Sequence, residues 1–91
     1  MTNLNKLYTL YDVCLQKEQE VLKDLLTNHL PKEYTLKVIK KLAGNNIRTD
    51  SQTVRNTKAG IGKNIIVFNA IIEVAKTYKD ASNKLKSNLQ N

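Results

Sequence analysis

The chain has 91 residues, long enough for one domain with a modest core, and a formal net charge of +7. It contains four Tyr, one Phe and no Trp, and its apolar residues are mostly Leu, Ile and Val, which favours a helical core over a large ligand pocket. The single cysteine, Cys14, excludes an internal disulfide framework, and the longest apolar run, 65–68, is too short to cross a bilayer. Because the N-terminus also lacks the pattern of a signal peptide, we expect a cytoplasmic protein without a membrane partner.

The positive charge is concentrated in the middle third of the chain. Residues 32–63 carry eight basic side chains against two acidic ones, a net charge of +6, whereas residues 1–31 carry −1 and residues 64–91 carry +2. A basic patch of this kind is an electrostatic footprint for a polyanion.

Residues 3–29 contain neither Pro nor Gly, and their apolar positions repeat with a helical period. The pattern predicts one long amphipathic N-terminal helix over 3–29, which Pro31 ends because the residue before a proline resists helical geometry. Two interpretations of its apolar stripe remain open: a cover for the core, or a dimer seam with approximate a and d positions. The stripe comprises Leu4, Leu7, Tyr11, Cys14, Val21 and Leu25.

Three further helices are expected, at about 34–43, 50–59 and 64–80 or longer. Gly44-Asn45-Asn46 is expected to stop the first, and Thr49 or Asp50 to cap the second. Gly60 closes that second helix, and Asn64 can cap the third. The predicted fold is a single all-α domain over 1–91 with four helices. Its core is expected at 34–80, followed by a frayed polar tail at 82–91.

The stretch 50–60 has the pattern of a short, weakly anchored helix. Val54 is its only large apolar side chain, while Gln52, Arg55 and Asn56 share another face at spacings of three and four residues. Gln, Arg and Asn are the side chains that form paired hydrogen bonds with base edges in the DNA major groove. This face is therefore our candidate for base contacts; the alternative is ordinary solvated surface.

The pair 34–43 and 50–59 resembles a helix-turn-helix, and Ser51-Gln52-Thr53-Val54 resembles the start of the recognition helix in the lac-repressor family. Residues 30–80 also resemble small helix-turn-helix proteins that are common in Bacteroidetes and their phages. The residues that carry this second resemblance are Leu30-Pro31-Lys32-Glu33-Tyr34, Ile47, Asp50, Val54, Gly60 and the apolar helix from Ile65.

The resemblance implies that Gln52 and Asn56 contact bases and that Arg55 contacts a base or a phosphate. The surrounding polar and basic residues would hold the DNA backbone, which positions a protein without reading sequence. The phosphate contacts expected are Lys40, Lys41, Arg48, Ser51, Thr53, Lys58, Lys63 and Asn64. Lys63 and Asn64 belong to the segment Gly62-Lys63-Asn64. This segment would place a phosphate at the start of a helix, where free N–H groups and the helix dipole favour an anion.

Other chemistry is not indicated by the sequence. The segment 60–64 fails the phosphate-loop spacing, because Thr57 stands where a Gly is needed and Asn64 where a Ser or Thr is needed. His29 is the only histidine, and neither a nucleophile–base pair nor a cofactor motif is present, so we expect no metal, no cofactor and no catalysis.

The sequence therefore predicts a protein that binds specific double-stranded DNA through a helix-turn-helix. Its role would be transcription regulation in a bacterium or phage, in the host cytoplasm if phage-encoded, with a homodimer as one option. The alternative is a virion-associated or protein-interaction helical module that binds nucleic acid or an acidic partner without sequence preference.

Overall fold

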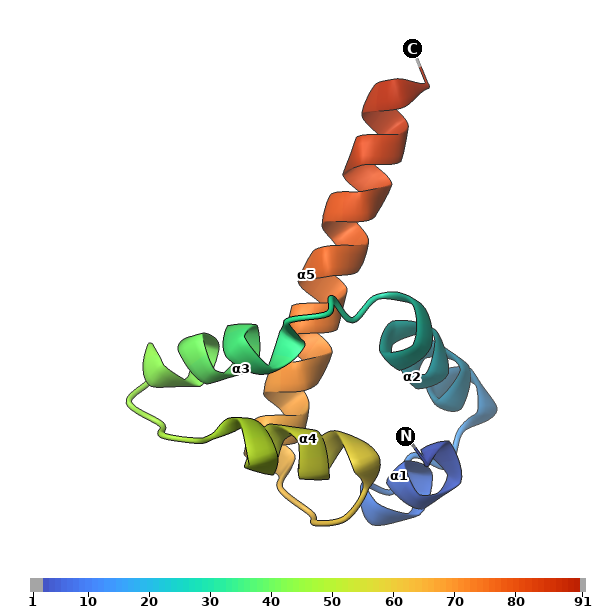
Figure 1. The fold of residues 1–91 in the computed structure, drawn as a ribbon. Coiled ribbons are helices and arrows are strands. Elements are labelled where there is room, and N and C mark those ends of the chain that lie inside the picture. Colours follow the sequence, from blue (N-terminus) through green and yellow to red (C-terminus); the bar gives the residue numbers. More distant parts are fainter. Residues whose placement is uncertain (1–2, 91) are drawn as a thin grey trace.

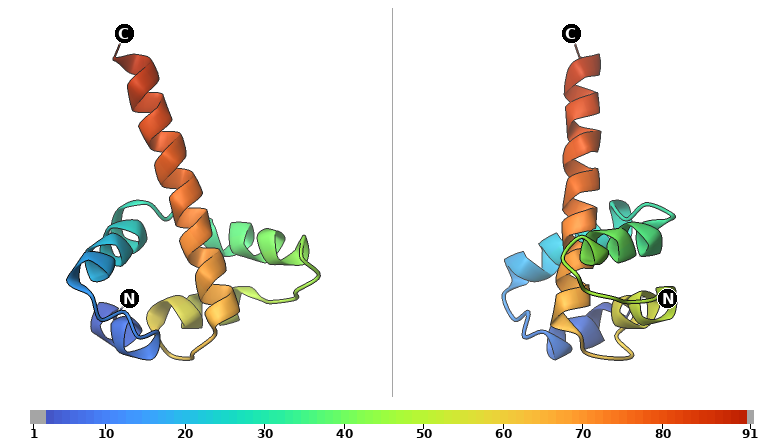
Figure 2. Two further views of the ribbon diagram at one scale, coloured as in Figure 1. Left: turned by 180° about the vertical axis from the view of Figure 1, so that it is seen from behind. Right: turned by 90° about the vertical axis from the view of Figure 1, so that its left-hand side faces the viewer.

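The structure, a computed structural model, describes residues 3–90 and contains five helices and no strand between these limits. Helix α5 forms a long axis, with the other helices packed around its first half, while its C-terminal half projects clear of them (Figures 1 and 2). The predicted all-helical class is confirmed, but the number of helices is five rather than four. The helices are α1 (Leu4–Leu10), α2 (Gln16–Asn28), α3 (Tyr34–Ala43), α4 (Ser51–Ala59) and α5 (Ile65–Leu89).

The prediction of one helix over 3–29 is wrong, because the chain turns between α1 and α2. Asp12 adopts the left-handed conformation, with φ of 54°, and the N–H of Val13 donates to the carbonyl of Tyr8 at 2.9 Å. This 6→1 hydrogen bond is the helix-ending motif in which a glycine usually takes the left-handed position. Asp is one of the few other residues that tolerate this conformation, so a helix can end here without Gly or Pro.

The break divides the predicted apolar stripe between two helices. Leu7 and Leu25 are buried, which supports the core interpretation for these positions. Cys14 instead lies exposed in the turn, and neighbouring Leu15 is 65% exposed. A continuous dimer seam along one helix over 3–29 therefore does not exist.

The core lies between the apolar face of α5 and the helices around it. Ile71 and Ala75 of α5 are fully buried, as are Leu7 of α1, Val38 of α3 and Val54 of α4. Each of the four shorter helices contributes at least one buried side chain, and α2, α3 and α4 pack directly against α5. No helix within residues 3–90 is long and apolar enough to cross a membrane.

The predicted boundaries of the helices after residue 30 agree closely with the structure, with one difference at the end of α5. The expected stop of α3 at Gly44-Asn45-Asn46 is confirmed: Asn46 takes the left-handed conformation, with φ of 62°, and the N–H of Ile47 donates to the Leu42 carbonyl at 2.9 Å. Helix α5 continues to Leu89, so most of the segment expected to be a frayed tail is helical.

Tyr11 joins the α1–α2 turn to the start of α5. Its ring stacks on Phe68 with a centroid separation of 4.1 Å and an interplanar angle of 7°. Its hydroxyl accepts a hydrogen bond at 3.0 Å from the backbone N–H of Asn64, the residue that caps α5. One side chain thus connects two segments that are 53 positions apart in the sequence.

Asp24 connects α2 to α5 by a charged interaction. Its carboxylate accepts hydrogen bonds at 2.9 Å from both Asn28 Nδ2 and Lys79 Nζ, and His29 Nε2 lies 3.3 Å away. The hydrogen bonds from Asn28 and Lys79 lower the pKa of Asp24 to about 2. The carboxylate therefore stays ionised under all but strongly acidic conditions.

We expect Leu7→Ala to lower the free energy of unfolding by about 2–5 kcal/mol, because it removes methyl groups from a fully buried site. The matched variant Leu15→Ala changes an exposed leucine and should shift stability by no more than about 0.5 kcal/mol. Urea denaturation followed by circular dichroism measures both, and equal losses would contradict the packing of α1 against the core.

The Asp24 interaction predicts a pH dependence of stability. The pKa of Asp24 is lower in the folded protein than the ordinary value of 3.8, so its contribution is complete above pH 4 and is lost as the pH falls toward 2. Asp24→Asn should consequently flatten the decline in unfolding free energy over this range, and Asp80→Asn, which removes an exposed carboxylate elsewhere on α5, serves as the matched control. Parallel curves for wild type and Asp24→Asn would rule out this contribution.

Candidate nucleic-acid interface

Helix α4 is fixed to the domain by one narrow face. Val54 is fully buried, and Thr57 is buried with its hydroxyl donating to the Thr53 carbonyl at 2.8 Å. At the start of the helix the Asp50 carboxylate accepts from the Thr53 N–H at 2.7 Å, and Gly60 ends the helix with φ of 80°. The predicted Asp50 and Gly60 caps are therefore confirmed.

The opposite face of α4 carries the three residues proposed to contact bases. Gln52 and Arg55 are exposed and Asn56 is half-buried. The Gln52 side-chain amide donates to Asn56 Oδ1 at 2.9 Å across one turn. This bond leaves Gln52 Oε1 free to accept and Asn56 Nδ2 free to donate. The pair therefore keeps one acceptor and one donor, the two kinds of group that the N6 amino group and N7 of an adenine require.

The N-terminus of α4 is unfavourable for a phosphate. Hydrogen bonds from the side chain and the backbone N–H of Thr53 hold the pKa of Asp50 below its ordinary value, and Arg55 lowers it further. A carboxylate thus occupies the end of the helix where the dipole would attract an anion. Any phosphate contact made by Ser51 or Thr53 would have to lie to one side of this charge.

A cleft of about 470 Å³ brings together three of the predicted phosphate contacts. Arg48 from the α3–α4 turn, Thr53 from α4 and Asn64 from the start of α5 all line it. Thr49 also lines this cleft, and its hydroxyl oxygen is buried without a hydrogen-bond partner among residues 3–90. Lys63 is exposed next to Asn64, so two cationic residues are available near the cleft, with Asp50 on its wall as an opposing charge.

Asn64 itself has a structural role that limits its use as a ligand. Its Oδ1 accepts from the Val67 N–H at 3.1 Å, which confirms the predicted cap of α5, and its own N–H is bonded to Tyr11. A phosphate at this helix end would therefore meet the Asn64 side-chain Nδ2 or the remaining N–H groups of the first turn, but not the backbone N–H of Asn64.

Lys58 is drawn into the packing of α4 against α3. Its Nζ lies 5.4 Å from the centroid of the Tyr34 ring, a cation–π geometry, and burial lowers the pKa of its ammonium group. The sequence provided no signal for this pairing, because the two residues belong to different helices. Lys58 is thus less available for a phosphate than the exposed Arg48 and Lys63.

Lys40 and Lys41 lie on the side of α3 that faces α5. With Lys37 they line a groove of about 510 Å³, opposite Tyr78 of α5, and Lys41 Nζ is 3.5 Å from a carboxylate oxygen of Glu73. The structure thus places these lysines beside α5, in a groove that the sequence analysis did not identify.

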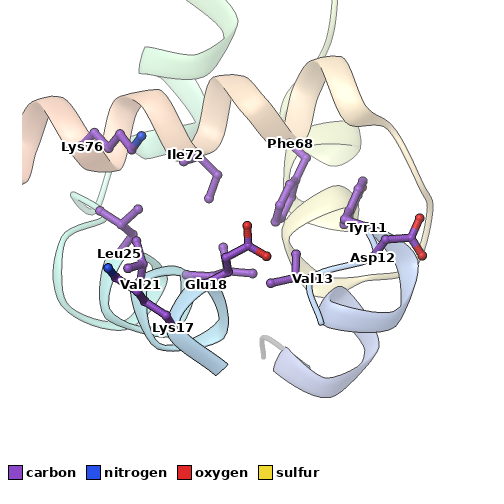
Figure 3. A pocket seen from close by; sticks show the side chains of 11 residues that line it. Tyr11, Asp12, Val13, Lys17, Glu18, Val21, Leu25, Phe68, Ile72 and Lys76 are labelled. Atoms are coloured by element: carbon purple, nitrogen blue, oxygen red, sulfur yellow. The ribbon is translucent and has the colours of Figure 1, made fainter. Parts of the chain in front are cut away.

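A third groove, of about 430 Å³, runs between α2 and α5 beside the α1–α2 turn (Figure 3). Val21, Leu25 and Ile72 make its walls apolar, and Lys17, Glu18 and Lys76 lie around it. This groove borders the turn at Asp12. The prediction of one continuous helix over 3–29 contained no such turn and therefore could not include the groove. No group of three or more His, Cys, Asp or Glu that could hold a metal ion occurs in the part of the chain that the structure describes.

We expect Asn64→Ala to destabilise the protein by about 1 kcal/mol, because the N–H of Val67 loses its cap. Asn69→Ala, at an exposed position inside α5, should leave stability equal or slightly higher because alanine favours helices. Thermal denaturation of the two variants decides this, and an unaffected Asn64→Ala would show that the cap contributes nothing.

Comparisons with protein-family models, with curated proteins and with solved structures return no match for this chain.

Proposed function

We propose that the protein binds double-stranded DNA with sequence preference, by inserting α4 into the major groove. The observation that carries the proposal is the face of α4: Gln52, Arg55 and Asn56 lie opposite the buried Val54, so the helix can remain attached to the domain while that face contacts bases. The biological role that fits is transcription regulation by occupancy of an operator.

The charge distribution supports the same partner. Residues 32–63, which include α3, α4 and the turn between them, carry a net charge of +6. Arg48 and Lys63 are exposed near the cleft beside α4 and would neutralise backbone phosphates on one side of the inserted helix. Each neutralised phosphate releases counterions, so binding should weaken steeply with salt.

The proposed specificity follows from the geometry of hydrogen bonding. The Gln52–Asn56 pair presents an acceptor and a donor suited to adenine, and Arg55 can form the paired hydrogen bonds that favour guanine. One such pair is worth about 1–3 kcal/mol of discrimination between bases. The preferred site should therefore contain adenine and guanine at neighbouring positions.

We expect a selection from random duplexes to yield a motif bound at least ~10³-fold more tightly than a scrambled duplex. Gln52→Ala and Arg55→Ala should each lower affinity for the motif by roughly 5–150-fold while leaving helicity unchanged. Fluorescence anisotropy across a salt series, together with circular dichroism, measures both effects.

Lys23→Ala is the matched control for Arg55→Ala, because it removes one exposed positive charge from α2, far from the α4 face. Specific affinity should change little in this variant. Equal affinity for motif and scrambled duplexes, with a steep salt dependence, would instead favour a packaging protein that binds nucleic acid without reading it. Absence of binding at low salt would leave the basic face for an acidic protein.

A further inference from the structure

The groove between α3 and α5 exposes apolar surface to solvent. It has a volume of about 510 Å³, and Pro31, Val74 and Tyr78 contribute apolar side chains to its lining. Val74 is buried and Pro31 is half-buried, whereas Tyr78 is 49% exposed. A partner seated in this groove would cover Tyr78 and remove apolar area from water, which is the main driving force of most protein association.

The α3 side of this groove is positively charged. Lys37, Lys40 and Lys41 are exposed at spacings of three and four residues, where like charges on a helix repel each other. Lys41 forms an ion pair with Glu73, but Lys37 and Lys40 form none with a carboxylate of residues 3–90. The helix dipole favours cations in the last turn of α3, which holds Lys40 and Lys41 but not Lys37. An anionic partner would relieve the repulsion among these lysines.

The surrounding charges leave the lining of the groove positive. Glu73 lies beside Lys41, and Glu33 lies one turn before Lys37, but neither lines the groove. On α5, Asp80 and Lys84 are four residues apart and offset each other. Within residues 3–90, the lining thus presents three ammonium groups and no carboxylate.

The groove between α2 and α5 lacks this bias. Lys17 and Lys76 line it, but Asp12 and Glu18 do so as well, and its charges therefore balance (Figure 3). Of these two apolar grooves beside α5, only the one bordered by α3 is complementary to an acidic partner.

The α3–α5 groove lies on the side of α3 that faces away from α4. Figures 1 and 2 show α4 on one side of α3 and the projecting half of α5 on the other, and the groove lies between α3 and residues 74–81. A duplex held against the outer face of α4 would leave Lys37 and Tyr78 uncovered. The basic residues of the segment 32–63 therefore divide between two surfaces, and the second is available to a different partner.

The combination of apolar and basic side chains favours a peptide over a nucleic-acid strand. A sugar–phosphate backbone would neutralise the lysines, but it has no apolar side chains to place against Val74 and Pro31. An amphipathic helix presents apolar side chains at spacings of three and four residues, and carboxylates can lie beside them. Such a helix matches both parts of the groove.

We propose that the groove between α3 and α5 binds an acidic amphipathic helix of a partner protein. The apolar side chains of that helix cover Val74 and Tyr78, and its carboxylates pair with Lys37 and Lys40. The interaction does not depend on DNA binding by α4, so the two proposals can fail separately.

A selection from a displayed library of random peptides, each of about 15 residues or four helical turns, tests the proposal on the full chain. The tightest binders should carry a net negative charge and apolar residues at spacings of three and four. When such a peptide is titrated into isotope-labelled protein, NMR should show shifts of the backbone amides of 37–41 and 74–81. The amides of 17–25, beside the groove of Figure 3, should stay unchanged.

Lys37→Glu with Lys40→Glu should weaken binding of the peptide by about tenfold or more, because its carboxylates then face like charges. Lys17→Glu with Lys23→Glu is the matched control, since it makes the same change in net charge at two exposed positions of α2. At about 0.15 M salt, where charges more than about 8 Å apart are largely screened, this control should bind the peptide as wild type does. Fluorescence anisotropy measures the affinities.

Tyr78→Gln should weaken binding by about fivefold or more, because the peptide loses an aromatic contact at the centre of the interface. Leu89→Gln changes an exposed apolar residue of α5 outside the groove and should have no effect. Circular dichroism verifies that all variants keep the helical fold.

Three results would overturn the proposal: no binder from the selection, binders without net negative charge, or amide shifts confined to another surface. Unchanged affinity in Lys37→Glu with Lys40→Glu would contradict it as well. A single-stranded oligonucleotide that occupies this groove more tightly than every selected peptide would assign the groove to nucleic acid instead.

Discussion

The apolar face of α5 is the constraint on which the rest of the structure depends. Helices α2, α3 and α4 all pack directly against it, and its central residue, Ile71, is fully buried. Burial of this face supplies much of the driving force for folding, because a modest core cannot rely on several independent clusters. The same face, extended beyond the domain, carries the exposed side chains of Tyr78, Leu85 and Leu89.

Two side chains hold the N-terminal helices against this axis by different physical means. Tyr11 stacks on Phe68 and accepts a hydrogen bond from the backbone at the start of α5, while Asp24 forms a charged hydrogen bond with Lys79. The first contact is between uncharged groups, whereas the second depends on a carboxylate that stays ionised down to strongly acidic pH. Tyr11 therefore supports the start of α5, which also borders the cleft beside α4, whereas Asp24 supports a later part of the helix.

The candidate interface shows how packing redistributes residues that look equivalent in sequence. In the sequence, the lysines of residues 32–63 form one uniform basic segment. In the structure, Lys58 lies over Tyr34 and Lys41 pairs with Glu73. Arg48 is instead left exposed beside the cleft. Helical periodicity could predict the face with Gln52 and Arg55 because neighbours within one helix are fixed by its geometry. The contacts of Lys41 and Lys58 with other helices depend on how the helices pack together, which the pattern of residues within one helix does not determine.

The sequence by itself determined the helical class, the extents of α3 and α4, and the caps at Asp50, Gly60 and Asn64, because these features depend on interactions among residues within a few positions of each other. Only the tertiary structure decided that the chain turns at Asp12, since that left-handed residue is held by contacts of Tyr11 with a segment far along the chain. The same holds for the grooves beside α5 and for the apolar side chains left exposed at its end. Each depends on which surfaces the other helices reach, and that is a property of packing rather than of any local stretch.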